Sequence, residues 1–78
     1  MASDQKELQL MVRREMARRP LDTSMVEVYA NHGVVYLRGS VRPVRGHDID
    51  LQHEVTILMT VLKQKPGIRD VVSELHLR

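Results

Sequence analysis

The chain of 78 residues contains no cysteine, tryptophan or phenylalanine, and its only aromatic residues are two tyrosines. Without cysteine, no disulfide can stabilise the fold and no thiolate can bind a metal or attack a substrate. No segment approaches the roughly 18 apolar residues of a membrane-spanning helix. The first ten residues, MASDQKELQL, carry acids and glutamines where an export signal is basic and then apolar. We therefore expect a cytoplasmic chain as written, or an envelope-associated one if it belongs to a longer exported protein.

Charge of neither sign dominates the chain. Twelve Lys and Arg oppose ten Asp and Glu, which gives a net charge of +2. This balance does not indicate nucleic-acid binding, and any electrostatic function must come from local clustering of charges. The length predicts one domain over residues 1–78, with a thin hydrophobic core.

The segment 26–41 predicts a β-hairpin around Asn31-His32-Gly33. Apolar and polar residues alternate on both sides of the turn, as in a sheet with one buried and one exposed face. Matching these faces places Ala30 opposite Val35 and Tyr29 opposite Tyr36, with a loop of four residues in which Gly33 supplies a positive φ. The inward set is Val26, Val28, Ala30, Val35, Leu37 and Val41; the outward set is Glu27, Tyr29, Tyr36, Arg38 and Ser40.

Two helices and a third strand surround this hairpin in sequence. The apolar positions Leu8, Met11, Val12 and Met16 predict a helix over about 4–18, begun by a capping box of Asp4 and Glu7 and ended by Pro20, with Leu10 exposed. Leu51, Val55, Leu58 and Leu62 predict a second helix over 47–64, which Pro66 and Gly67 end. Residues 68–77 predict a strand with Val71, Leu75 and Leu77 inward and Val72, Glu74 and His76 outward.

The order α-β-β-α-β predicts an α+β fold, a two-layer sandwich with two helices on one face of a three-stranded mixed sheet. We prefer a strand order in which the last strand lies beside and parallel to the second, because the long helical crossover permits a right-handed connection. A last strand beside the first, in a wholly antiparallel sheet, is the alternative.

Several motifs accompany this order of elements: Val12, Met16, Val26-x-Val28, Asn31-His32-Gly33-x-Val35-x-Leu37-x-Gly39-x-Val41 and Pro66-Gly67-Ile68-x-x-Val71-x-x-x-Leu75-x-Leu77. In this order and in these motifs the chain resembles the BON domain, named for bacterial osmotic-shock and nodulation proteins. The resemblance covers nearly the whole chain. It implies the same sandwich and a non-enzymatic module that binds phospholipid membranes or mediates contacts in envelope and stress-response proteins. The segment between Gly39 and Gly67 is about two helical turns longer than is usual in that family.

No motif in the sequence indicates catalysis. There is no nucleophile motif, no meaningful Ser-His-Asp spacing and no glycine-rich phosphate loop. His47, Asp50 and Glu54 share a face of the predicted second helix, but acids near a helix N-terminus are expected for the helix dipole alone, so we predict no metal and no cofactor. Gly33, Gly39 and Gly67 are interpreted as structural turn glycines.

Three surfaces are candidates for binding. Arg18, Arg19, Arg42 and Arg45, joined by Arg78 if the last strand is parallel to the second, form a predicted basic pole with an excess of about two charges, suited to an anionic phospholipid surface. Tyr29, Tyr36, Arg38 and Val72 form the second candidate, an uncovered sheet face for a protein partner or a second copy of the chain. The tyrosines could equally be a cross-strand pair that stabilises the hairpin. The outer face of the second helix, around Ile57 and Val61, is another self-association surface. Membrane binding is the first functional interpretation and protein interaction or self-assembly the alternative.

Overall fold

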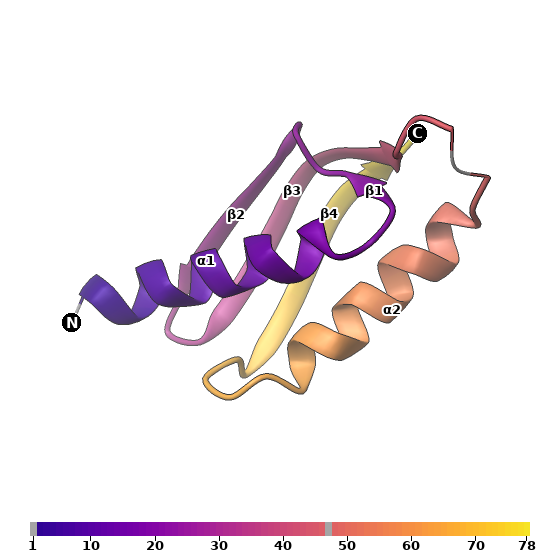
Figure 1. Ribbon diagram of the computed structural model, residues 1–78. Coiled ribbons are helices and arrows are strands. Elements are labelled where there is room, and N and C mark those ends of the chain that lie inside the picture. The colour runs from indigo at the N-terminus through magenta and orange to yellow at the C-terminus, as the bar shows by residue number, and fades with distance from the viewer. Residues whose placement is uncertain (1, 47) are drawn as a thin grey trace.

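The protein is an α+β sandwich of two layers, a sheet and two helices that both lie on one face of it (Figure 1). The computed structural model describes the backbone of residues 2–46 and 48–78 and the side chains of residues 5–46 and 48–78. Along these residues the elements are α1 (Ala2–Ala17), β1 (Leu21–Asp22), β2 (Val26–Asn31), β3 (Val34–Pro43), α2 (Leu51–Lys63) and β4 (Asp70–Leu77). The predicted order of helices and longer strands is confirmed. The prediction of three strands was wrong, because β1 adds a fourth.

The central strand of the sheet is β3. It pairs with β2 in antiparallel fashion, with Ala30 opposite Val35 and Tyr29 opposite Tyr36, which is the register expected from the alternation. On its other edge β3 pairs with β4 in parallel, and Tyr36 lies opposite Val72. The alternative with the last strand beside the first is therefore excluded.

The turn between β2 and β3 is tighter than predicted. Asn31 and Val34 still pair in the ladder, so the loop has two residues, His32 and Gly33, and not four. Both have positive φ, 51° for His32 and 80° for Gly33. Two-residue hairpin loops favour this conformation because its twist matches that of the strands. Gly33 thus has the predicted role, but His32 takes the second left-handed position.

The core lies between the sheet and the helices. From α1 it takes Val12 and Met16, and from α2 it takes Val55, Leu58 and Leu62, as the apolar stripes predicted. Leu77 lies on the inward face as predicted, opposite the buried Val41, but it is exposed at the end of the edge strand β4. The buried sheet positions are Val26, Ala30, Val35, Leu37, Val41 and Val71, with Leu21 and Ile68 completing the core.

Both helices begin at other residues than the sequence indicated. Helix α1 starts before Asp4, so the proposed capping box does not mark its beginning. Helix α2 starts at Leu51 and not near residue 47, because the Asp50 carboxylate caps it by accepting a hydrogen bond from the His53 N–H. Ile49 consequently precedes the helix and packs against the core, whereas a longer helix would have directed it away.

Between β1 and β2 the backbone at Met25 comes very close to the backbone of β3 at Gly39. Residues 23–25 form a turn between them, and the Ser40 N–H donates to the Met25 carbonyl oxygen across the sheet at 3.2 Å. Gly39 has φ +122° and pairs with Val26 at this point. A Cβ at Gly39 would overlap the Met25 carbonyl oxygen and lie 3.3 Å from the Val26 Cα. Gly39 is therefore required by close packing inside the sheet, and was wrongly interpreted as a turn residue.

Candidate binding surface

The face of the sheet opposite the helices carries a row of exposed apolar side chains. Tyr29, Tyr36 and Val72 lie side by side on β2, β3 and β4 through the two ladders. Their exposed fractions are 55%, 36% and 36%. The two rings tilt by 40° with centroids 5.9 Å apart, a distance typical of an interacting aromatic pair. We call these three residues the tyrosine row.

A row of charges follows along the strands. Glu27 lies opposite Arg38 on one side, and Glu74 lies opposite Arg38 on the other. The Arg38 Nε and Glu74 Oε1 are 3.9 Å apart, and both side chains are mostly exposed. An exposed ion pair of this length contributes about 0–1 kcal/mol at most, so all three groups can interact with a partner. Glu27, Arg38 and Glu74 are called the charged row.

The sequence correctly predicted the positions of these two rows. All four predicted contact residues, Tyr29, Tyr36, Arg38 and Val72, lie on the uncovered face. The rival surface on α2 is less available, since Ile57 and Val61 are both half-buried. Leu10 is exposed as expected, but on α1 and away from the sheet face.

The predicted basic pole is largely neutralised by carboxylates. Arg18 pairs with Glu15 at 3.1 Å, Arg19 with Glu54 at 3.0 Å and Arg42 with Asp22 at 3.0 Å. The expected excess of about two charges counted only Asp22, Asp48 and Asp50 as nearby acids, and it left out Glu15 and Glu54. Lys65 also approaches Glu15, at 3.3 Å. Three of the five predicted arginines therefore already hold a carboxylate.

A small hollow of about 340 Å³ remains beside Arg42 and Arg78. Asp22 lies in it and accepts hydrogen bonds from the backbone N–H and hydroxyl of Ser24. These two bonds, with Arg42 beside them, lower the pKa of Asp22 to about 2. Met25, at the rim, is 70% exposed, which no pattern in the sequence indicated.

Two of the three residues considered as metal ligands, Asp50 and Glu54, have other partners in the structure. Asp50 caps α2, and Glu54 accepts a hydrogen bond from Arg19 at 3.0 Å. His47 lies outside the described residues. Within residues 2–46 and 48–78 no three His, Cys, Asp or Glu side chains are arranged to hold a metal ion. Neither described helix is long and apolar enough to cross a membrane.

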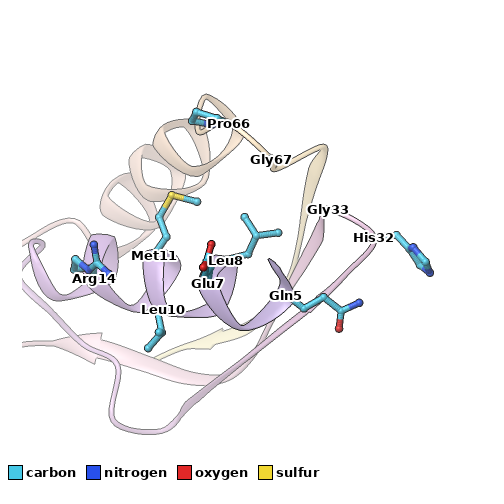
Figure 2. A pocket seen from close by; sticks show the side chains of 10 residues that line it. All are labelled: Gln5, Glu7, Leu8, Leu10, Met11, Arg14, His32, Gly33, Pro66 and Gly67. Atoms are coloured by element: carbon cyan, nitrogen blue, oxygen red, sulfur yellow. The ribbon is translucent and has the colours of Figure 1, made fainter. Parts of the chain in front are cut away.

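A larger cleft of about 900 Å³ lies between α1, the β2–β3 turn and the segment after α2 (Figure 2). Leu8 and Met11 point toward the Pro66–Gly67 segment, whereas Leu10 points to the opposite side of α1 and His32 points outward. The polar side chains that line it do not converge on one point.

In comparisons with family models, curated proteins and solved structures, no match to this chain was found.

Proposed function

We propose that the protein is a non-enzymatic binding module of the BON type, and that it contacts a protein partner through the uncovered face of its sheet. The tyrosine row is the observation that carries this proposal. Tyrosine is enriched at protein interfaces because its ring is apolar while its hydroxyl tolerates water. The three apolar side chains are contiguous, whereas scattered exposed apolar residues need no explanation.

The resemblance to BON domains supports a module without catalytic function. The elements follow the order that the resemblance implies, and the motif residues from Asn31 to Val41 lie in the hairpin of β2 and β3. Such resemblance bears on the fold more directly than on the partner, because one fold serves many functions. The partner must therefore be inferred from the surface itself.

Charge on the sheet face favours a protein over an anionic membrane. Around the tyrosine row lie Glu27 and Glu74 with only Arg38 between them. Two carboxylates beside one guanidinium repel anionic headgroups. A protein surface, by contrast, can present matching charges of both signs.

Contact with anionic phospholipid is the second candidate, and the exposed Met25 favours it. Met25 stands beside Arg42 and Arg78, an apolar side chain flanked by cations. Such a tip suits the boundary between headgroups and acyl chains. Because Asp22 already holds Arg42, we expect this binding to be weaker than binding at the sheet face.

Capture experiments test the proposal directly. Wild type, Tyr36→Glu and the control Leu10→Glu are compared as baits in a lysate of the source organism. Leu10 is exposed on α1, so its variant introduces the same charge away from the sheet. We expect proteins that wild type and Leu10→Glu retain and Tyr36→Glu loses. Identical capture by all three would contradict the proposal.

Liposome co-sedimentation distinguishes the second candidate. Vesicles of phosphatidylglycerol with phosphatidylcholine, and of phosphatidylcholine alone, are compared over a series of salt concentrations. Salt-sensitive binding that Arg42→Gln/Arg78→Gln abolishes, and that Lys6→Gln/Arg69→Gln retains, would establish the membrane interpretation instead. The control pair removes the same charge from the opposite end of the molecule, where Arg69 precedes β4 and Lys6 lies on α1 next to Gln5, which contacts Asn31 at the β2–β3 turn.

A further inference from the structure

We infer that two copies of this chain pair through the edge of β4, with antiparallel strands and with Leu75 of each copy opposite Leu75 of the other. The inference goes beyond the proposed function, because it concerns the edge of the sheet and leaves the uncovered face free. Two observations carry it: the backbone groups that β4 presents at its edge, and the half of β4 that α2 does not cover.

Strand β4 lies at one edge of the sheet and presents a row of backbone groups there. It pairs with β3 in parallel, and successive residues of a strand direct their N–H and C=O groups to opposite sides. The Arg78 N–H donates to the Val41 carbonyl oxygen of β3 at 2.9 Å. The groups that point away from β3 are therefore those of Val71, Ser73, Leu75 and Leu77.

The first of these N–H groups is already bonded. The Val71 N–H donates to the Asp70 carboxylate at 2.8 Å. Among the residues that the structure describes, nothing accepts a hydrogen bond from the N–H groups of Ser73, Leu75 and Leu77. The available donors are thus centred on Leu75.

The other edge of the sheet, at β2, is protected. The Met25 carbonyl oxygen faces β3, where it accepts from Ser40, so the Val26 carbonyl oxygen faces away from β3. There it accepts a hydrogen bond from Arg13 Nη2 of α1 at 2.9 Å. Strand β4 contains no proline, glycine or lysine, and its register with β3 is unbroken along its whole length. Such an edge is a template for another strand.

Pairing about Leu75 uses all three available donors. Antiparallel strands exchange two hydrogen bonds at alternate residue pairs. With Leu75 opposite Leu75, Ser73 of each copy lies opposite Leu77 of the other, and each of these N–H groups meets a carbonyl oxygen. An axis at Glu74 would set two glutamates opposite each other and would require the Val71 N–H, which is already bonded. The register about Leu75 is therefore favoured.

This register also gives complementary side chains on the uncovered face. Glu74 of each copy lies opposite His76 of the other, and a ring N–H of His76 can donate to the Glu74 carboxylate. Both side chains are exposed in the single copy. The axis itself passes through the apolar Leu75, so no charged side chain faces its own counterpart.

Helix α2 covers only the first half of β4. It runs antiparallel to β4 and ends at Lys63, whose Nζ lies 3.9 Å from the Asp70 carboxylate (Figure 1). Its 13 residues span about 20 Å at about 1.5 Å per residue, the length of about six residues of a strand. The helix therefore begins near the level of Leu75. Val71 is accordingly buried, whereas Leu77 is 40% exposed.

The covered half of one copy complements the bare half of the other. In the pair, Leu77 of one copy lies beside Ser73 of the other, at the level that the second copy's α2 covers. Ser73 is on the same side of the sheet as the helices yet is exposed, which leaves room beside it for Leu77. Each α2 extends only to the level of the axis, so the two helices do not occupy the same segment of the sheet. A second copy thus buries apolar surface that one copy exposes.

The pairing enlarges the uncovered face of the sheet. A two-fold axis perpendicular to the sheet keeps both tyrosine rows on the same side. Three strands about 4.8 Å apart and about eight residues long, at about 3.3 Å per residue, give each copy a face of about 360 Å². The joined faces, about 720 Å², approach the roughly 800 Å² that one partner buries in a standard stable interface.

A proline at the edge tests the pairing. In Ser73→Pro the N–H is lost and the ring occupies the free edge, where strands tolerate proline. Ser73→Ala keeps the N–H and is the matched control. In sedimentation velocity at high micromolar concentration we expect wild type and Ser73→Ala to dimerise, and Ser73→Pro to be a monomer with the circular dichroism of wild type. A wild type that is monomeric at millimolar concentration, or a Ser73→Pro that dimerises equally well, would overturn the inference.

A charge exchange tests it without altering the backbone. His76→Glu sets two glutamates opposite each other, so we expect the Kd of the dimer to rise about tenfold. Glu74→Lys/His76→Glu restores opposite charges and should recover most of the affinity. Both side chains are exposed, so the variants should fold. A double variant as weak as His76→Glu would exclude this pairing.

The absence of cysteine permits a test of register. Glu74→Cys and His76→Cys, mixed and oxidised, should form a disulfide between copies, because these positions lie directly opposite each other. Glu74→Cys alone should not, because its two thiols are then offset along the strands. Disulfide dimers of Glu74→Cys alone, without the mixed product, would move the axis to Glu74 and overturn the register.

The inference and the proposed function fail separately. Tyr36→Glu should dimerise as wild type does, because Tyr36 lies on the face and not at the β4 edge. Capture that depends on Tyr36 by a chain that never dimerises would overturn only the inference. Edge dimers whose capture is indifferent to Tyr36→Glu would support the inference and contradict only the proposed function.

Discussion

Replacing Gly39 with alanine tests the packing at the centre of the sheet. The new Cβ would overlap the Met25 carbonyl oxygen, which belongs to the backbone and cannot rotate away. It would also hold an alanine at φ +122°, a conformation that L residues rarely adopt. The Ser40 N–H donates to this same oxygen, so relief of the overlap must disturb that hydrogen bond.

The expected loss of stability follows from these terms. A strained backbone residue costs about 1–3 kcal/mol, and the disturbed hydrogen bond adds about 0.5–1.5 kcal/mol. We therefore expect Gly39→Ala to lower the free energy of unfolding by about 2–4 kcal/mol. A chain of 78 residues has a total of about 4–12 kcal/mol at roughly 0.05–0.15 kcal/mol per residue. The variant loses a large part of it, and its Tm falls by about 8–30 °C, at roughly 4–8 °C per kcal/mol.

Gly46 provides the matched control for this measurement. It also has a positive φ, +89°, but a Cβ there meets no atom within 4 Å. In Gly46→Ala only the unfavourable backbone conformation lowers the free energy of unfolding, by about 1–2 kcal/mol, and the lower entropy of the unfolded chain offsets part of this loss. Urea unfolding followed by circular dichroism measures both variants. Equal losses in the two would refute the argument that the Met25 carbonyl oxygen excludes a side chain at Gly39.

Three further predictions concern charged side chains. Because the pKa of Asp22 falls from 3.8 to about 2 on folding, its contribution to stability is complete above pH 3.8 and disappears as the pH falls to about 2. The difference in the free energy of unfolding between wild type and Asp22→Asn should therefore shrink over this interval. A difference that is independent of pH would contradict the lowered pKa of Asp22. Glu54→Gln should lower the free energy of unfolding by about 1 kcal/mol, because it weakens a half-buried pair with Arg19 that links the end of α1 to α2. A chelator should leave the Tm of wild type unchanged, and a fall in Tm would show that the fold is stabilised by a metal ion.

The hairpin and its outward face could be predicted because the alternation of apolar and polar residues is compatible with only one register of the two strands. A slip of one residue would have exposed Leu37 and buried Arg38, so the pattern alone placed Tyr29 beside Tyr36. The position of Val72 followed from the length of the crossover, which permitted a parallel last strand. The candidate contact surface was thus accessible from the sequence.

Features that depend on distant contacts could not be predicted in this way. Strand β1 has only two residues, too few to show a period. The sequence shows the charge of Arg19 but not its pairing with Glu54, which lies 35 residues away. The first residue of α2 could not be predicted, because Asp48 and Asp50 are equally plausible caps by residue type. Only the packing of Ile49 against the core shows that the helix begins after Asp50.

The stability of the fold does not depend on the side chains of the uncovered sheet face. Every fully buried side chain in the described part of the chain lies on the other face, between sheet and helices, where Met16, Leu37 and Leu62 are inaccessible to solvent or nearly so. Burial of that kind is the main favourable term in folding, so a single copy has its core without a partner. The tyrosine row and the charged row can then vary in sequence at small cost to the fold. The fold therefore does not depend on the tyrosine row and the charged row, and this leaves both available for the contact with another molecule that we propose.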